Sequence, residues 1–295
     1  MSTDWQKLIY RQGSTVEHQL SASGGSGGTK YSFGGSYYKE NGIIPGQDFS
    51  RFSLRTTIDH QISKKLRAGI NTMNTLSYSN AGGNPVGGLA RLSPLTTPYL
   101  PDRTLNMTPL AGLLDNLTVN PLTIITKAGS IKNLTRRLRT FNSLYGEWDI
   151  IDGLKYRINV GLDYRQDQND NYFGPNTMYN TNTTIDKSNE YVGNSEAWTY
   201  TLENLLTYYK TFLDKHRISF TGLYSVQKDH NQGSGFNGTG ILADYIQNYN
   251  LNLANTITAN NGTFSERGLI SYMGRLNYSY DGRYLVTATV RRDGA

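Results

Sequence analysis

Cysteine is absent from the 295 residues of this sequence. The chain therefore has no disulfide framework and no thiolate metal site. It also lacks a run of about 18 apolar residues, which excludes a transmembrane helix. The start, Met1 to Trp5, is polar and lacks the apolar segment of a signal peptide. Hydrophobic residues make up only 37%, below the roughly 45–50% that is usual in soluble domains.

Concentrated positive charge is also missing. The formal net charge is +6, but lysine and arginine are spread along the chain without a basic run, so we predict no nucleic-acid partner. The histidines, His18, His60, His216 and His230, show no metal-ligand spacing. Asp167 and its neighbours lack the register and the glycine of a calcium loop. We predict neither a metal site nor a cofactor.

Carboxylates that lie close in sequence are the remaining candidates for catalysis. Asp167 with Asp170, and Glu190 with Glu196, could serve glycoside hydrolysis if each pair were held at the right separation. Both pairs lie in stretches rich in polar residues, which favours solvated charges or a weak cation site. We predict no catalytic residue, and hence that the protein is not an enzyme.

Alternating side chains are what the sequence has in abundance. Between Leu154 and Asp167, the even positions up to Tyr164 are apolar and the odd positions are mostly charged or polar. Since successive side chains of a strand face opposite sides, this stretch predicts a strand with one apolar and one polar face. Tyrosines near both ends of the apolar face, with aliphatic residues between them, are typical of a strand in a membrane barrel.

The same alternation predicts about ten strands in all. The others lie near 16–22, 31–37, 52–58, 66–70, 144–150, 198–208, 218–226, 270–280 and 284–290. Tight turns are expected near 24–28, 63–65, 152–153, 213–215 and 281–282, and loops near 1–13, 41–48, 75–137, 168–195 and 229–265. The segment 75–137 holds six of the eight prolines, which predicts a loop with short helical turns.

Short turns and mostly long loops thus alternate along the chain. Outer-membrane barrels show this asymmetry, with short periplasmic turns and long extracellular loops. A solenoid would need a fixed repeat period, which is absent, and a sandwich would not sort its loops by end. We predict an all-β fold, an antiparallel transmembrane β-barrel.

The face of the strand on which a side chain lies predicts what it contacts. Tyr156, Tyr164, Trp148, Tyr278, Tyr280 and Tyr284 are expected in the aromatic girdles of the apolar face. The lumen face is expected to be wet, charged and in contact with a plug, and it includes Arg55, Arg157, Asp163, Arg165, Glu203 and Arg275. Aromatic residues expected in loops could stack on sugar rings, pack the loop or contact a lid protein; they are Tyr172, Phe173, Tyr179, Tyr191, Phe236, Tyr245 and Tyr249.

Several segments resemble, in order and spacing, the SusC/RagA family of TonB-dependent outer-membrane transporters from Bacteroidetes. They are residues 20–26, 29–38, 41–44, 49–59 and 66–71, Ser93-Pro94 with Pro98-Tyr99, and residues 274–280 and 283–295. Ala295 stands where serine is commoner. The resemblance covers nearly the whole chain.

The resemblance implies a barrel of about 22 strands with a plug in its lumen. It further implies a SusD-like lipoprotein lid, energy from the TonB complex, and uptake of oligosaccharides or other large nutrients, including peptides, through the cell outer membrane. Residues 1–295 match part of the barrel domain only, without the plug, the TonB box or the closing strands. We therefore expect an internal piece of a longer protein, which alone would not transport because open strand edges are not tolerated in lipid.

Two other classes of protein stay open at this point. A passive porin or adhesin barrel would lack a plug-coding region upstream. A soluble β-rich carbohydrate-binding module would stay in solution without detergent, whereas a barrel segment would be recovered in aggregates or in the outer membrane.

Overall fold

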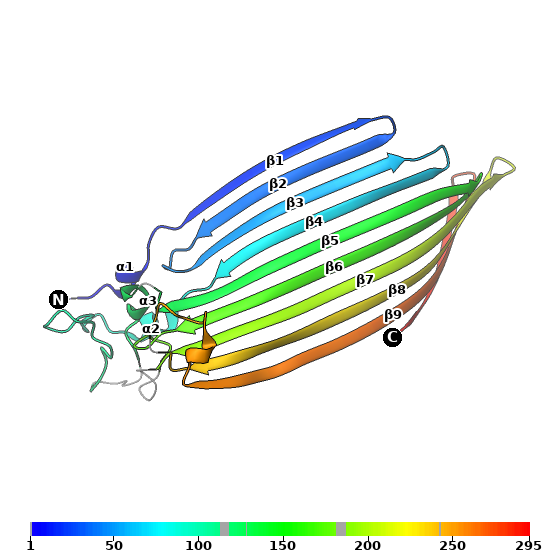
Figure 1. The fold of residues 1–295 in the computed structure, drawn as a ribbon. Coiled ribbons are helices and arrows are strands. Elements are labelled where there is room, and N and C mark those ends of the chain that lie inside the picture. The colour runs from blue at the N-terminus through cyan, green and yellow to red at the C-terminus, as the bar shows by residue number, and fades with distance from the viewer. Residues whose placement is uncertain (1, 113–117, 128, 181–186, 242) are drawn as a thin grey trace.

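A computed structural model describes residues 2–112, 118–127, 129–180, 187–241 and 243–295. Its main feature is one antiparallel sheet of ten strands that pair in sequence order (Figure 1). The strands are β1 (Ser14–Ser26), β2 (Thr29–Asn41), β3 (Asp48–Gln61), β4 (Leu66–Asn80), β5 (Ile131–Ile151), β6 (Leu154–Phe173), β7 (Asn189–Phe212), β8 (His216–Thr239), β9 (Thr256–Tyr280) and β10 (Tyr284–Gly294). The short helices are α1 (Trp5–Ile9), α2 (Val86–Arg91), α3 (Thr123–Thr126) and the 3-10 turn η1 (Leu251–Leu253). The number and order of strands agree with the sequence prediction.

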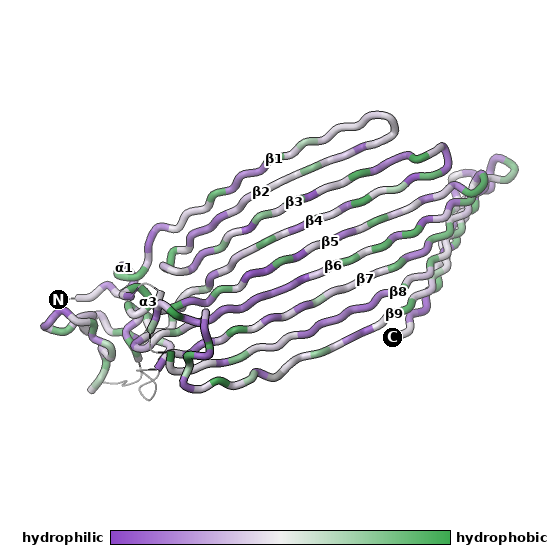
Figure 2. Tube along the Cα trace, viewed as in Figure 1, coloured by the Kyte–Doolittle hydropathy of each residue, from purple (hydrophilic) through white to green (hydrophobic). Residues whose placement is uncertain are grey.

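Strand register places apolar residues next to one another on one face. Leu144 of β5 lies opposite Val160 of β6, which in turn lies opposite Leu202 of β7. Hydrophilic and hydrophobic segments alternate along the strands in Figure 2. The apolar face carries the residues that were predicted for the aromatic girdles, and Trp148 lies opposite Tyr156. Many large apolar side chains stay exposed there, as expected of a surface made for a nonaqueous environment.

Tight turns join the strands at one end of the sheet. The first is shorter than predicted, because β1 continues to Ser26 and only Gly27 and Gly28 separate it from β2. Both glycines have left-handed backbone angles, with φ of 58° and 82°, which is the geometry of a two-residue hairpin that matches the strand twist. Gly153 has a φ of 78° in the turn between β5 and β6. In the last turn, Asp281 and Gly282 have φ of 51° and 69°.

The long connections at the other end are also shorter than predicted. They span 81–130, 174–188 and 240–255 rather than 75–137, 168–195 and 229–265. The segments that were wrongly assigned to loops are mostly polar and lack a regular hydrophobic alternation, yet their backbones continue the ladder. Hydrogen bonds of the main chain do not depend on alternating side chains.

Residues 1–13, predicted to be a loop, instead contain α1. Trp5 and Ile9 of this helix are buried with Leu92, Leu110 and Leu122 in a small core, which we call the rim core. Asp4 caps the helix by accepting a hydrogen bond from the backbone of Lys7. The sequence signal was weak because a five-residue helix carries hardly more than one apolar turn. α1 therefore fixes the segment 81–130 to the end of the sheet.

The sheet is curved and open in the part of the chain that is described. β1 and β10 each pair along one edge only, and β10 lies behind the other strands in Figure 1. Among the described residues, no helix is long and apolar enough to cross a membrane.

Candidate functional site

The polar face of the sheet holds all the residues that were predicted to face a lumen. Arg55 lies on β3, Glu203 on β7 and Arg275 on β9. Strand β6 carries Arg157, Asp163 and Arg165. All three are at odd-numbered positions, so their side chains lie on the same face of the strand. Asn159 lies opposite Glu203 and donates a 3.0 Å hydrogen bond to it. These side chains thus lie opposite the apolar face, as the alternation requires.

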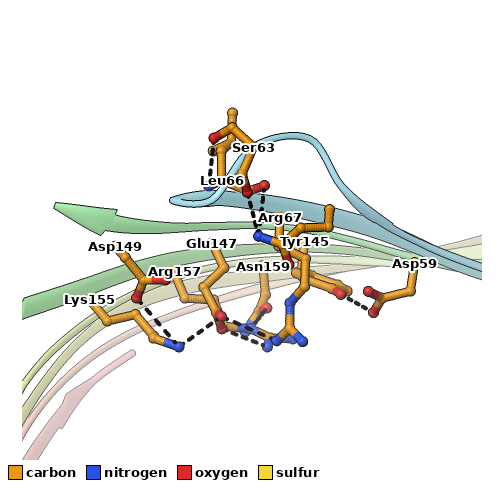
Figure 3. A network of polar contacts seen from close by, with 11 residues as sticks. Asp59, Ser63, Leu66, Arg67, Tyr145, Glu147, Asp149, Lys155, Arg157 and Asn159 are labelled. Atoms are coloured by element: carbon orange, nitrogen blue, oxygen red, sulfur yellow. Dashed lines mark hydrogen bonds and ion pairs between the residues drawn. The ribbon is translucent and has the colours of Figure 1, made fainter. Parts of the chain in front are cut away.

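Glu147 is the centre of a charged network on this face, near the tight turns (Figure 3). Its side chain is one-tenth exposed and accepts from Arg67 at 3.1 Å and from Lys155 at 3.0 Å. Arg157 approaches the other carboxylate oxygen at 3.4 Å. Because Arg67 lies on β4 while Lys155 and Arg157 lie on β6, the carboxylate clamps both strands to β5.

Tyr145 completes the network two residues before Glu147. Its hydroxyl donates to Asp59 of β3, and its ring centroid lies 4.2 Å from the guanidinium carbon of Arg157 and 5.6 Å from that of Arg67. Cations over a ring face are attracted by its quadrupole. Prediction from sequence missed Tyr145, Glu147 and Arg67, although the alternation around Leu144 and Trp148 already assigns Tyr145 and Glu147 to the polar face.

Asp167, one of the carboxylates considered for catalysis, is paired with a cation. Arg137 donates two hydrogen bonds to it, at 2.7 and 2.9 Å. The bidentate geometry satisfies both carboxylate oxygens. This supports the structural interpretation of Asp167 rather than a catalytic one. Among the described residues, no group of three or more His, Cys, Asp or Glu is arranged to hold a metal ion.

The aromatic residues that were predicted to lie in loops are distributed differently. Four of the seven are on strands: Tyr172 and Phe173 end β6, Tyr191 begins β7, and Phe236 is on β8. Tyr172 is fully buried and cannot contact a ligand in this arrangement. The Tyr191 ring occupies the space that side chains at Gly193 and Gly235 would need, which accounts for those two glycines. Phe236 lies opposite Val192, on the side of the apolar face.

The remaining loop aromatics fall into two groups. Tyr179 packs on Phe173 with ring centroids 4.3 Å apart, and its hydroxyl accepts a 2.7 Å hydrogen bond from the backbone of Asn84. Tyr245 and Tyr249 are 85% and 75% exposed. The ammonium of Lys132 lies 4.1 Å from the Tyr249 ring centroid. Both rings are therefore available to a partner or a ligand.

Tyr179 also lines an open cavity of about 500 Å³ at the loop end of the sheet. We call this space the rim cavity; its other lining residues are Glu40, Gly42, Gln47, Asp48, Phe49, Asn80, Ala81, Gly82, Asn84 and Asn133. Carboxylates, amides and aromatic rings are thus gathered from distant segments of the chain. The described residues that line the cavity include no lysine or arginine. Sequence reasoning missed this cavity because no periodic pattern links residues so far apart.

The comparisons with known proteins agree with this architecture. TonB-dependent receptor P3 of Formosa agariphila is 27% identical over 306 residues, which cover 100% of this chain and 29% of the relative. TonB-dependent receptor SusC of Bacteroides thetaiotaomicron is 24% identical over 318 residues, which cover 100% of this chain and 30% of the relative. The chain thus spans about three tenths of the length of these curated relatives. No family model matches.

Solved structures show the same fold. The RagAB peptide importer in its open-open state superposes with a TM-score of 0.83 at 18% identity, over 99% of this chain and 32% of that one. The ferric citrate transporter FecA superposes with a TM-score of 0.54 at 10% identity, over 95% of this chain and 35% of that one. The fold is therefore that of a TonB-dependent outer-membrane barrel.

Fold and relatives together define the class of protein. The chain is a segment of an outer-membrane β-barrel of the TonB-dependent receptor class. Within that class it is SusC/RagA-like, which confirms the resemblance, the all-β fold and the outer-membrane location predicted from sequence. The relatives are receptors and importers by name, in agreement with the prediction that the protein is not an enzyme. We therefore expect the apolar face to contact lipid and the polar face to line the lumen.

Proposed function

We propose that the whole protein imports a nutrient too large for porins across the outer membrane, with energy from the TonB complex. A SusD-like lipoprotein covers its extracellular mouth, and a plug occupies the lumen. The similarity to TonB-dependent receptors along the full chain is the observation that carries this proposal. The loops 81–130, 174–188 and 240–255 supply the mouth, and the exposed rings of Tyr245 and Tyr249 contact the lid.

The ligand that we propose is an oligosaccharide, and its support is the chemistry of the rim cavity. The carboxylates of Glu40 and Asp48 accept hydrogen bonds from sugar hydroxyls, and the Tyr179 ring offers a flat apolar face. Asn84 and Asn133 offer both donors and acceptors. Because the described lining holds carboxylates and neither lysine nor arginine, it favours a neutral hydroxylated ligand over an anionic one. RagAB is a peptide importer by name, so peptide uptake is the second candidate.

The test uses the full-length gene with its neighbouring lipoprotein gene, returned to a deletion strain. We expect Tyr179→Ala and Asp48→Asn to slow growth on the cognate glycan and to leave growth on glucose unchanged. Phe236→Ala, on β8 and outside the lining of this cavity, is the matched control. Growth defects confined to peptide media would replace the oligosaccharide with a peptide, and unchanged growth on every polymer would remove the rim cavity from uptake.

A strain without a working TonB complex distinguishes active from passive transport. Uptake of a fluorescent oligosaccharide should stop in that strain, whereas a passive porin would continue to admit it. Sequencing the genes around the locus tests the ligand class independently: glycoside hydrolase genes would support an oligosaccharide, and peptidase genes would support a peptide.

A further inference from the structure

The polar face of the sheet has a hollow of its own, away from the rim cavity. Its floor is a row of short side chains, because Gly161 of β6 lies opposite Ser143 of β5 and opposite Thr201 of β7. The result is an open cavity of about 330 Å³ between β5 and β8, which we call the wall cavity. Each of these four strands is paired along both edges. Gly161 is closer to Leu154, at the turn end of β6, than to Phe173 at the loop end, so the wall cavity lies deep in the barrel wall.

Carboxylates border the wall cavity on both sides of its floor. Toward the loops, Asp163 lies opposite Thr199, which in turn lies opposite Asp229. Toward the turns, Asn159 lies opposite Glu203. Acceptors from β6, β7 and β8 therefore surround the same open space.

Two of these carboxylates have no cation beside them. Arg139 pairs with Asp163 at 2.5 Å, whereas Glu203 and Asp229 form no ion pair with any residue that the structure describes. The described lining of the wall cavity also includes no lysine or arginine. This lining disfavours an anionic ligand and leaves acceptors for a ligand that donates hydrogen bonds.

Neutral side chains hold these two carboxylates in place. Asn159 donates to Glu203 at 3.0 Å. Thr199 donates to Oδ1 of Asp229 at 2.6 Å, and Gln227 lies 3.2 and 3.1 Å from its two oxygens. A carboxylate has about four acceptor sites, so both groups are oriented and still have lone pairs for a further donor. A hydroxyl that donates to such a group forms a charge-assisted hydrogen bond.

Phe141 adds a flat apolar surface to the same cavity. It lies on β5 opposite Asp163, lines the wall cavity and is 43% exposed, although its face of the sheet is otherwise mostly polar. A sugar ring can pack its C–H groups on a phenyl ring while the hydroxyls at its edge donate to carboxylates. The volume is at the lower end of the roughly 300–1,000 Å³ of small-molecule sites, which suits one sugar ring rather than a chain of them.

We propose that the wall cavity is a second sugar subsite, which holds one ring of the oligosaccharide after the chain has left the rim cavity. The proposal rests on the proposed function, since it assumes an oligosaccharide that passes through the lumen. Phe141 packs on the ring, Glu203 and Asp229 accept from its hydroxyls, and Gly161 provides the space. A cationic side chain of the plug would also suit the two carboxylates, but it would need neither the open floor nor the exposed phenyl ring.

The experiment follows fluorescein-labelled hexaoses of glucose, xylose, mannose and galactose in cells with the full-length gene and its neighbouring lipoprotein gene. Surface binding is measured in a strain without a working TonB complex, and uptake in the energised strain. Glu203→Gln and Asp229→Asn should each slow uptake of the accepted hexaose about tenfold, because a hydrogen bond to a charged group contributes about that factor. Phe141→Ala and Gly161→Leu should slow it without any change of charge. All four should leave surface binding unchanged, whereas Tyr179→Ala should weaken both.

Matched controls are Met73→Ala and Asp59→Asn. Met73 lies directly opposite Phe141, Asp59 lies on the polar face of β3, and neither lines the wall cavity. Both variants should take up the hexaose like the wild type. Phe141→Tyr keeps the flat ring and should retain uptake, which separates loss of the ring from a general packing defect. Heat modifiability on gels confirms that each variant assembles.

Three results would overturn the proposal. Normal uptake in all four wall-cavity variants, with normal uptake in the wild type, would remove this subsite and leave the proposed function intact. Increased entry of vancomycin in Glu203→Gln or Asp229→Asn would show that the plug no longer seals the barrel and would assign the wall cavity to the plug. A wild type that takes up none of the hexaoses would count against the proposed function itself, and this proposal would fail with it.

Discussion

The hydroxyl of Tyr172 donates a 2.6 Å hydrogen bond to Oδ1 of Asp244. This contact joins the end of β6 to the segment 240–255, and Lys127 of the neighbouring long loop pairs with the same carboxylate. Asp244 therefore fastens two loops to one strand. Burial and the bond to Asp244 raise the pKa of Tyr172, so the hydroxyl stays a donor at all physiological pH values.

Tyr172→Phe should loosen the segment 240–255. The change leaves a buried carboxylate oxygen without its donor, which costs about 1–3 kcal/mol. We expect faster amide hydrogen exchange in 243–255 of the full-length protein, with no change in the transmembrane parts of the strands. Tyr245→Phe, at an exposed ring, is the control and should exchange like the wild type.

Glu190 should make the closure of the same segment pH-dependent. It is 3% exposed, and neither carboxylate oxygen has a hydrogen-bond partner among the described residues. Burial raises its pKa above the ordinary value of 4.5. A raised pKa means that the closed state holds the proton more tightly than the open one, so closure is favoured below pH 4.5 and weakens as the pH rises through the raised value.

Limited proteolysis of the segment 240–255 at pH values below and above 4.5 measures the effect. Glu190→Gln keeps the shape of the side chain and removes its titration, so the part of the pH dependence of cleavage that comes from Glu190 should vanish. Cleavage that stays equally pH-dependent in Glu190→Gln would show that Glu190 is not the source of the effect.

Arginine at Leu144 should block assembly of the full-length barrel. Leu144 lies opposite Val160 on the apolar face, which should contact lipid, and a cation near the bilayer midplane costs about 2–4 kcal/mol. Arginine at Ser143, the adjacent residue on the lumen face and opposite Gly161, should be tolerated. Heat modifiability on gels measures assembly, and similar behaviour of the two variants would contradict the assignment of faces.

Glu147→Gln should destabilise the barrel wall. The variant leaves Arg67, Lys155 and Arg157 close together without their shared carboxylate. The cations are more than one-third exposed, so solvent screening limits the cost to about 1–3 kcal/mol. The loss in melting temperature should shrink at high salt. Asp149→Asn, which removes one ion pair at 3.6 Å, is the control and should have a much smaller effect.

A cysteine at Gly282 should be inaccessible to a membrane-impermeant reagent added to intact cells, whereas one at Tyr245 should react. The tight turns are expected on the periplasmic side and the long loops outside. Both residues are exposed on the surface of the structure. A difference in labelling would therefore report the side of the membrane on which each residue lies, not burial within the protein. Labelling at Gly282 alone would reverse the orientation.

The strands could be predicted because apolar and polar side chains must alternate along the parts that cross the membrane. Leu144, Val160 and Leu202 lie on the apolar face while their chain neighbours lie on the polar face, and this alternation can be read directly from the sequence. The extensions of β6 to β8 are mostly polar and alternate less regularly, and for that reason they were assigned to loops. The rim cavity was also beyond reach, because Glu40 and Tyr179 are brought together by loop packing rather than by a repeating pattern.

Strand length differs greatly across the sheet. β1 and β2 have 13 residues each, while β9 has 25, or roughly 80 Å along the strand. The rim at the loop end therefore slopes: β5 to β9 form a high wall of paired strands, and β1 to β4 form a lower edge completed by loops that pack on the rim core of Trp5, Ile9 and Leu122. Opening of the mouth should occur at this lower edge, where a few apolar contacts must separate, and should leave the high wall unchanged.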